Sequence, residues 1–472
     1  MTPVVRNSIS LFLAYSLARA LAFALTVILP RYFPDEIFGA YAFAVSFANM
    51  MVVFTELGMQ APLIREMAAR RSEASRLASN ALTIRMILCL LTFGAITLYL
   101  NLMGYSPRTI RIAYIVALSE LINSLSQLFR SVFRAFERMA YEAVTVALDR
   151  AMVLGIGLLL VTRGYGMEAF CWSMAGVSLF ILMVTAALTQ IAFVRVMPAF
   201  SPKVWRRLME WSLPFALANV LNMVYFKLGI LMLSKLSPHG EVAVAWYNVG
   251  YAMIMALLVL PGAFSGAIYP EISRLFAEKN GAKLQLFYHT SLKLMAAAGL
   301  PMALMLFAGA DDIVKLFYGP SRFPEGTVDA ALRVLAWSGL FSFLNAVIAS
   351  FYRAGDRRRA FTIAIGSTAA VNLILNSILI PRMDHVGAAL AMASSELFFL
   401  AAGLIYMRKV LGLRVIWREI YPVLICSAAL GGYLAAVRGM SAALIPLGGI
   451  GYGAALMAVG AVRFEELRRL QA

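Results

Sequence analysis

The chain is built from a succession of long apolar runs separated by short basic or proline- and glycine-rich segments. A membrane-crossing helix needs about 20 consecutive apolar residues, and lipid offers no partners to the backbone, so each run is expected to be a helix. The alternating ten-residue segments of a membrane β-barrel are absent from the sequence. We therefore predict an all-α polytopic membrane protein with about 14 transmembrane helices. The predicted helices are 8–29, 36–58, 82–103, 110–133, 143–162, 168–194, 211–234, 242–268, 284–308, 329–352, 360–380, 386–407, 417–437 and 441–462.

Composition excludes a soluble protein. Of the 472 residues, 62% are hydrophobic and 14% are charged, whereas soluble domains are roughly 45–50% apolar and about 25% charged. Extra length in a soluble chain adds domains with polar surfaces of their own, so one soluble core cannot bury this excess. The start of the chain has no clear cleavage site and is interpreted as a retained first helix. Because all three cysteines fall inside apolar runs, a disulfide framework is not expected.

The net charge of +17 follows the loops of the predicted membrane protein. If the N-terminus is cytoplasmic, cytoplasmic segments carry 25 of the 41 lysines and arginines, and segments on the opposite side carry 9. Basic residues concentrate in the cytoplasmic loops of membrane proteins. This asymmetry predicts that both termini are cytoplasmic, and it accounts for the charge without a nucleic-acid partner.

Two segments repeat at an offset of 219 residues. The segment Phe133–Met139 aligns with Tyr352–Arg358, and the same offset aligns Glu168 with Gly387. Each copy then contains six predicted helices, and both copies enter the membrane in the same direction, as in transporters built from parallel repeats. We predict two pseudo-symmetric six-helix lobes and a C-terminal helix pair with a short basic cytoplasmic tail, at 1–197, 198–410 and 411–472.

Between the second and third predicted helices the chain reads Thr55-Glu-Leu-Gly-Met-Gln-Ala-Pro-Leu-Ile-Arg-Glu-Met-Ala68. This segment resembles the acidic-Leu-Gly…Arg signature of bacterial polysaccharide flippases, which move lipid-linked oligosaccharides. They belong to the multidrug/oligosaccharidyl-lipid/polysaccharide exporter superfamily. Three weaker motifs are similar to that family: Phe38-Gly-Ala-Tyr41, Arg134-Ala-Phe-Glu-Arg138 and Trp211-Ser-Leu-Pro214.

The resemblance implies a function in surface polysaccharide assembly, such as O-antigen, capsule or exopolysaccharide. It implies movement of a polyprenyl-pyrophosphate-linked oligosaccharide across a bacterial inner membrane, through a central cavity between two lobes. It also implies that the last helix pair guides the lipid tail. The expected partners are the lipid-linked oligosaccharide, membrane lipids, and the polysaccharide polymerase and chain-length machinery. No cofactor is expected, and the dispersed histidines predict no metal site.

Charged residues inside the predicted helices are candidate substrate contacts, because intramembrane charge is costly. Arg19 lies near the middle of the first helix, and Lys227 lies in the seventh, its equivalent in the repeat. Arginine forks and lysine ammonium groups both bind phosphate, so we predict that these two cations face one cavity. The further candidates are Lys293 and Arg150, with Arg85 and Arg130 as weaker ones expected to extend to the membrane surface.

Three acids at mid-depth, Glu120, Asp149 and Glu396, are candidates for coupling transport to protons or sodium, although neutralisation of nearby arginines is favoured. The fourth predicted helix also carries a polar stripe on one face. We expect this stripe to pack against other helices rather than to line a wet path. Its residues are Glu120, Asn123, Ser124, Gln127, Ser131 and Arg134.

Two other functions remain open. A cation-coupled multidrug antiporter of the same superfamily would use buried acids, yet the first and seventh predicted helices contain no aspartate or glutamate. A membrane glycosyltransferase or polysaccharide ligase would need a catalytic acidic cluster. The longest predicted outer loop, about 309–328, offers only Asp311, Asp312 and Glu325.

Overall fold

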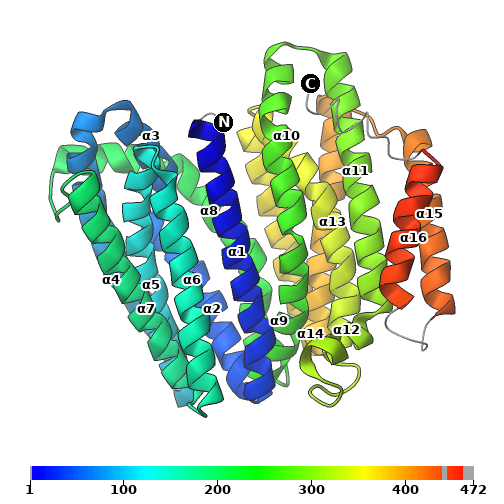
Figure 1. Cartoon of the computed structure of the whole chain (residues 1–472), viewed down its shortest axis with the longest axis horizontal. Helices are drawn as coiled ribbons and strands as arrows, with labels where there is room; N and C mark the ends of the chain where they lie inside the picture. The colour runs from blue at the N-terminus through cyan, green and yellow to red at the C-terminus, as the bar shows by residue number, and fades with distance from the viewer. Residues whose placement is uncertain (1–2, 438–443, 461–472) are drawn as a thin grey trace. The chain divides into compact units, whose positions relative to one another are not determined.

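The computed structural model describes residues 3–437 and 444–460, and all regular structure in them is helical (Figure 1). Eleven helical segments of this described part are long and apolar enough to cross a membrane. The predicted all-α polytopic fold is therefore confirmed. The predicted basic tail falls mostly on residues 461–472, which lie outside the described residues.

The chain divides into two compact units. The N-terminal unit comprises residues 1–235 and 239–245, and the C-terminal unit comprises residues 236–238 and 246–472. The helices of the N-terminal unit are α1 (Pro3–Tyr32), α2 (Asp35–Glu56), α3 (Gln60–Ala69), α4 (Ala74–Leu102), α5 (Pro107–Ala135), α6 (Met139–Thr162), α7 (Met167–Ala192) and α8 (Pro202–Leu236), with a 3₁₀ turn at Arg71–Glu73.

The remaining helices belong wholly or mainly to the C-terminal unit. Helix α9 starts in the N-terminal unit, at Glu241, and continues into the C-terminal one. These helices are α9 (Glu241–Leu257), α10 (Val259–Ala277), α11 (Gly281–Ala308), α12 (Ala310–Tyr318), α13 (Val328–Ala354), α14 (Arg358–Val410), α15 (Trp417–Ala436) and α16 (Leu444–Ala458).

Several helices differ from the apolar runs. Helix α8 starts nine residues before residue 211, where the predicted span begins. Its first turns are polar and amphipathic, so the apolar run does not mark them. The predicted helices 360–380 and 386–407 are present as the two halves of α14, which is kinked at Asp384, with φ 55° and ψ −135°, inside the predicted break. The predicted helix 242–268 is broken after Leu257, and the loop predicted at 309–328 contains α12.

Within each unit one long helix packs against several others. In the N-terminal unit α5 packs against α2, α4 and α7, while α1 packs along α6. In the C-terminal unit α13 packs against α10, α11 and α14, and α15 packs against α11 and α16. The polar stripe of α5 is therefore placed among helices rather than against lipid.

The two segments that repeat at an offset of 219 residues have the same backbone conformation. After α5 the amide of Arg138 donates to the carbonyl of Phe133 at 2.9 Å. After α13 the amide of Arg357 donates to the carbonyl of Tyr352 at 3.0 Å. Each turn contains one non-glycine residue in the left-handed conformation. It is Glu137 in the first turn, with φ 59°, and Asp356 in the second, with φ 53°. Both helices thus end in the same turn.

The flippase-like motifs have structural explanations. Leu57 and Gly58, with φ of 43° and 72°, end α2 and redirect the chain into α3. Gly39, in the Phe-Gly-Ala-Tyr motif, lies so close to the start of α9 that a Cβ atom there would be 1.7 Å from the carbonyl oxygen of Glu241. The first motif makes a tight turn, and the second allows two backbones to meet.

Candidate functional site

The N-terminal unit contains a cavity of about 570 Å³ between its helices. Its wall comes from α1, α2, α5 and α6, with single residues from α3 and α7. Most of the intramembrane charge of this unit gathers here. The charged residues in the wall are Arg19, Glu120, Arg130, Arg134, Glu142, Asp149 and Arg150.

The cavity brings together five of the residues singled out in the sequence. Arg19 projects from α1 and is exposed in this wall, while Glu120 and Arg130 come from α5 and Asp149 and Arg150 from α6. These positions are distant in sequence and meet because α1 packs on α6 and α5 lies beside α6. An anion entering this cavity would meet charges from three helices.

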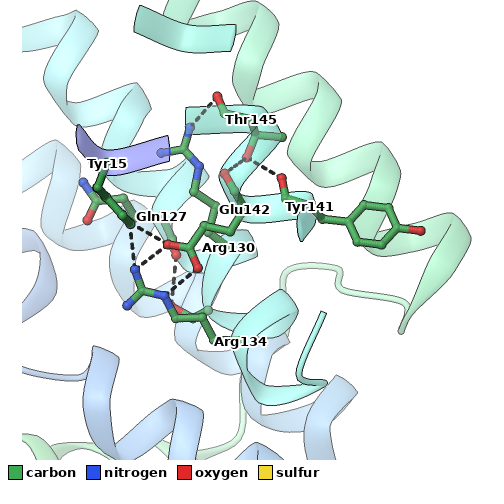
Figure 2. Close-up of polar contacts among 8 residues, drawn as sticks. Tyr15, Gln127, Arg130, Arg134, Tyr141, Glu142 and Thr145 are labelled. Atoms are coloured by element: carbon green, nitrogen blue, oxygen red, sulfur yellow. Dashed lines mark hydrogen bonds and ion pairs between the residues drawn. The ribbon is translucent and has the colours of Figure 1, made fainter. Parts of the chain in front are cut away.

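A polar cluster that the sequence did not suggest links these three helices (Figure 2). The hydroxyl of Tyr15 donates to Oε1 of Glu142 at 2.6 Å, and Nε of Arg134 donates to Oε2 of the same carboxylate at 2.7 Å. Nη2 of Arg134 also donates to the Tyr15 hydroxyl at 2.9 Å. Glu142 is fully buried, so its charge is compensated within this cluster.

Carboxylates compensate only some of the arginines in the cavity. Arg134 is paired with Glu142, and Arg150 has its Nε 3.6 Å from Oδ2 of Asp149. Within the described part of the chain, no carboxylate lies within ion-pair distance of Arg19 or Arg130. Four arginines and three carboxylates line the cavity, so its wall carries a net positive charge, and Arg19 and Arg130 are the arginines outside these ion pairs.

Arg130 is buried in this wall. Its side chain is 6% exposed, and Nη2 makes one long hydrogen bond, 3.4 Å, to the carbonyl of Thr145 (Figure 2). Its Nε has no hydrogen-bond partner in the described structure. The expectation that Arg130 extends to the membrane surface is wrong, because helix packing encloses it.

Arg85 is buried outside the cavity wall. It is 1% exposed and donates from Nη1 to the carbonyl of Ser124 at 2.8 Å. The hydroxyl of Ser124 is hydrogen-bonded to that of Thr55 at 2.7 Å. Arg85 thus joins α4 to α5 beside the end of α2, and it too does not extend to the membrane surface.

The polar stripe of α5 divides between two environments. Glu120, Asn123, Gln127 and Arg134 line the cavity, whereas Ser124 packs against the end of α2. The expectation that the whole stripe packs against other helices is therefore wrong for Glu120, Asn123 and Gln127, whereas Arg134 also bonds to α1 and α6. The sequence signal was correct about the face but could not indicate which neighbours leave room for a cavity.

Three predicted residues lie elsewhere. Lys227, on α8, is half-buried and interacts electrostatically with Glu120. In the C-terminal unit, Lys293 is buried with its Nζ 3.8 Å from the Glu419 carboxylate, and Glu396 accepts a hydrogen bond from Asn345 at 2.6 Å. These C-terminal contacts fasten α15 to α11 and α14 to α13.

The acids of the predicted outer loop are engaged with a lysine. Nζ of Lys315 lies 2.7 Å from Oδ2 of Asp311 and 3.5 Å from Oε1 of Glu325. The hydrogen bond that Lys315 donates to the Asp311 carboxylate raises the pKa of Lys315. In the described chain no three or more His, Cys, Asp or Glu residues are grouped so as to hold a metal ion. This loop thus carries a surface ion-pair network.

Comparison of the sequence with known protein families identifies the family of this chain. Residues 4–276, more than half of the chain, match the family described as polysaccharide biosynthesis protein. The chain belongs to this family. Residues 214–378 also match the family described as MatE, which places the protein in the wider exporter superfamily. Its members are transporters rather than enzymes, so the glycosyltransferase alternative is wrong.

Relatives of this polysaccharide biosynthesis family member span most of its length. It is 21% identical to the Shigella flexneri protein named "Putative O-antigen transporter", over 67% of this chain and 77% of that protein. It is 22% identical to the Haloferax volcanii "Probable low-salt glycan biosynthesis flippase Agl15", over 83% and 81% of the two chains. Its fold is similar to that of the lipid II flippase MurJ in an inward closed conformation, with a TM-score of 0.79 at 15% identity, covering 96% of this chain and 98% of that one. The protein is thus a flippase-like membrane transporter related to O-antigen transport proteins.

Proposed function

We propose that this protein moves a polyprenyl-pyrophosphate-linked oligosaccharide from the cytoplasmic to the periplasmic leaflet of a bacterial inner membrane. The glycan supplies a surface polysaccharide such as O-antigen, capsule or exopolysaccharide, and the transporter works beside the polymerase and chain-length machinery. Transport follows alternating access, in which two lobes open in turn toward either side of the membrane. The names of the relatives from Shigella flexneri and Haloferax volcanii support this substrate class.

One observation carries the proposal. Arg19 and Arg130 line a membrane-embedded cavity and have no carboxylate partner in the part of the chain that the structure describes. Unpaired intramembrane charge is costly and is kept where it serves a ligand. Guanidinium groups bind phosphate through parallel hydrogen bonds, which suits a pyrophosphate. Lys227 is assigned as a further cation beside Glu120, while Arg150, Lys293 and Arg85 are assigned structural roles.

The proposed architecture has fourteen spans in two pseudo-symmetric six-helix lobes, at 1–197 and 198–410, followed by a helix pair. The matching turns after α5 and α13 support the repeat. The two halves of α14 count as two spans, while α8 and α16 supply the other two that the eleven long helices leave out. The basic loops support cytoplasmic termini.

A cation-coupled antiporter is the second candidate, because the C-terminal match is to the MatE family. Such a transporter would use acids to bind its coupling ion. Glu120 and Asp149 line the cavity, but Asp149 lies beside Arg150, and Glu396 is bonded to Asn345. We assign these acids primarily to charge neutralisation, which favours the flippase.

The test is transbilayer movement of a prenyl-pyrophosphate oligosaccharide in proteoliposomes. Arg19→Gln and Arg130→Gln are expected to reduce the rate at least tenfold, because each removes a phosphate contact. Arg111→Gln is the matched control, since Arg111 is exposed and paired with Glu168 at 3.0 Å. Movement unaffected by both cavity variants would remove this site. If the wild type moved no lipid but exported drugs in exchange for cations, the antiporter would replace the flippase.

A further inference from the structure

Helix α5 turns one particular set of polar side chains toward the cavity. Asn123, Gln127 and Arg130 line it and are spaced at i, i+4 and i+7, which places them on one face. Asn123 and Arg130 are two turns apart, about 10.5 Å along the helix axis. The face therefore offers an amide at one end and a guanidinium at the other.

Both ends of this face have unmet hydrogen-bonding capacity. Asn123 is 9% exposed and Arg130 is 6% exposed. Within the described structure, Oδ1 of Asn123 and Nε of Arg130 have no hydrogen-bond partner. Leaving a buried polar atom unpaired is costly, and native proteins contain few such atoms. Two of them on one face of one cavity indicate a site that is completed by a ligand.

The size of the cavity limits what this ligand is. Pockets for small molecules measure roughly 300–1,000 Å³, and this cavity measures about 570 Å³. It has room for a pyrophosphate and one sugar. The Asn123 side chain hydrogen-bonds to Glu120, which leaves its Oδ1 to accept a bond from a hydroxyl of that sugar.

We propose that this face of α5 binds the pyrophosphate together with the first sugar of the glycan. Arg130 holds phosphate oxygens, Asn123 accepts a hydrogen bond from a sugar hydroxyl, and Gln127 lies between them. Asn123 is then a specificity-determining residue for the first sugar. This inference rests on the proposed function and extends it to a defined part of the substrate.

The test uses the full-length protein in detergent and two kinds of probe. One is farnesyl pyrophosphate, and the others carry N-acetylglucosamine, galactose or glucose on the same pyrophosphate. The wild type is expected to bind at least one sugar-bearing probe about tenfold more tightly than the sugarless one. Asn123→Leu is expected to abolish this preference, because a site built to bond a hydroxyl loses its discrimination when the bond is removed. Arg130→Gln is expected to weaken the binding of all the probes about equally.

Three further variants make the result specific. Asn123→Asp keeps an acceptor oxygen and is expected to retain the preference, even if the added charge weakens all binding. Asn101→Leu is the matched control, because Asn101 is exposed at the end of α4 and bonded to Tyr114. Asn123→Ala replaces the leucine variant if that protein unfolds.

Several results would overturn the inference. It fails if the wild type prefers no sugar, or if the Asn123→Leu and Asn123→Ala proteins keep the preference. It also fails if loss of the amide weakens sugarless and sugar-bearing probes equally, which would indicate a structural role. If Arg19→Gln and Arg130→Gln left the binding of farnesyl pyrophosphate unchanged, the anion site of the proposed function would fail as well. A weakened anion site with an unchanged sugar preference would remove only the role of Asn123.

Discussion

At the scale of single residues, Glu142 holds the cavity wall together, because one carboxylate receives hydrogen bonds from α1 and α5 while its own backbone belongs to α6. Glu142→Gln keeps the shape but removes the charge that compensates Arg134. Because Arg134 remains partly exposed, we expect a loss of about 1–3 kcal/mol in the free energy of unfolding. Denaturant unfolding in detergent measures it.

A second glutamate serves as a control, because it tests whether losing any ion pair destabilises the protein as much as losing the buried one. Glu168 is paired with Arg111 at 3.0 Å, but both side chains are exposed. Glu168→Gln is therefore expected to cost no more than about 1 kcal/mol, as for other surface pairs. Equal losses in the two variants would contradict the role given to Glu142.

The same comparison shows what the sequence could indicate about the site. Arg19 was detectable because a charge in the middle of an apolar run is conspicuous. Glu142 was not, because it lies at the start of its helix, where a carboxylate is ordinary. Its bond to Tyr15 joins residues 127 positions apart. Such a contact depends on how α1 packs against α6, which no local pattern records.

At the scale of helices, Gly39 sets how closely α2 approaches the start of α9. A Cβ atom at this position would lie 1.7 Å from the carbonyl oxygen of Glu241, so the backbone must shift to accept it. We expect Gly39→Ala to destabilise the protein by about 1–3 kcal/mol, as for other overpacked sites. Thermal unfolding of the purified protein measures this effect.

The control for Gly39→Ala is another helical glycine with open space around it. A Cβ atom on Gly155, in α6, would meet no atom within 4 Å. Gly155→Ala is expected to leave stability unchanged or to raise it by up to about 1 kcal/mol, because alanine favours the helix. If both variants lowered the melting temperature equally, close approach would not explain Gly39.

A second element-scale feature is the segment between α7 and α8, which is held against α4 by hydroxyl groups. Ser79 accepts a hydrogen bond from the amide of Met197 at 3.2 Å, and Thr83 accepts one from Ala199 at 2.8 Å. Removing both hydroxyls, in Ser79→Ala with Thr83→Val, should release this segment. We expect trypsin to cleave after Arg195 several times faster in limited proteolysis, because locally opened backbone is cut first.

The matched control is Thr97→Val, also in α4. The hydroxyl of Thr97 bonds only to the carbonyl of Phe93 in its own helix. Cleavage after Arg195 should remain at the wild-type rate in this variant. An equally fast cut would mean that any loss of a hydroxyl from α4 loosens the segment.

The helices that the sequence predicted least well share one physical cause. Apolar runs mark where a helix crosses lipid, but they do not mark where it ends. The first turns of α8 are polar, and α9 ends at Leu257, inside a continuous apolar run. The all-helical fold was therefore more predictable than the helix boundaries, which depend on packing and turn geometry outside the apolar runs.

At the scale of the whole molecule, the pyrophosphate substrate proposed for this net cationic cavity predicts that the membrane potential drives transport. A pyrophosphate carries negative charge outward, and an inside-negative potential contributes about 2.3 kcal/mol per elementary charge for each 100 mV. We expect movement of a prenyl-pyrophosphate glycan in proteoliposomes to accelerate several-fold when a potassium gradient with valinomycin sets a potential of this sign. A proton gradient imposed at zero potential should have little effect, because the cavity acids Asp149 and Glu142 are placed beside arginines. If the potential left the rate unchanged while the proton gradient raised it, the arginines would serve only to bind the substrate, and Glu120 would become the first residue to test as the proton carrier.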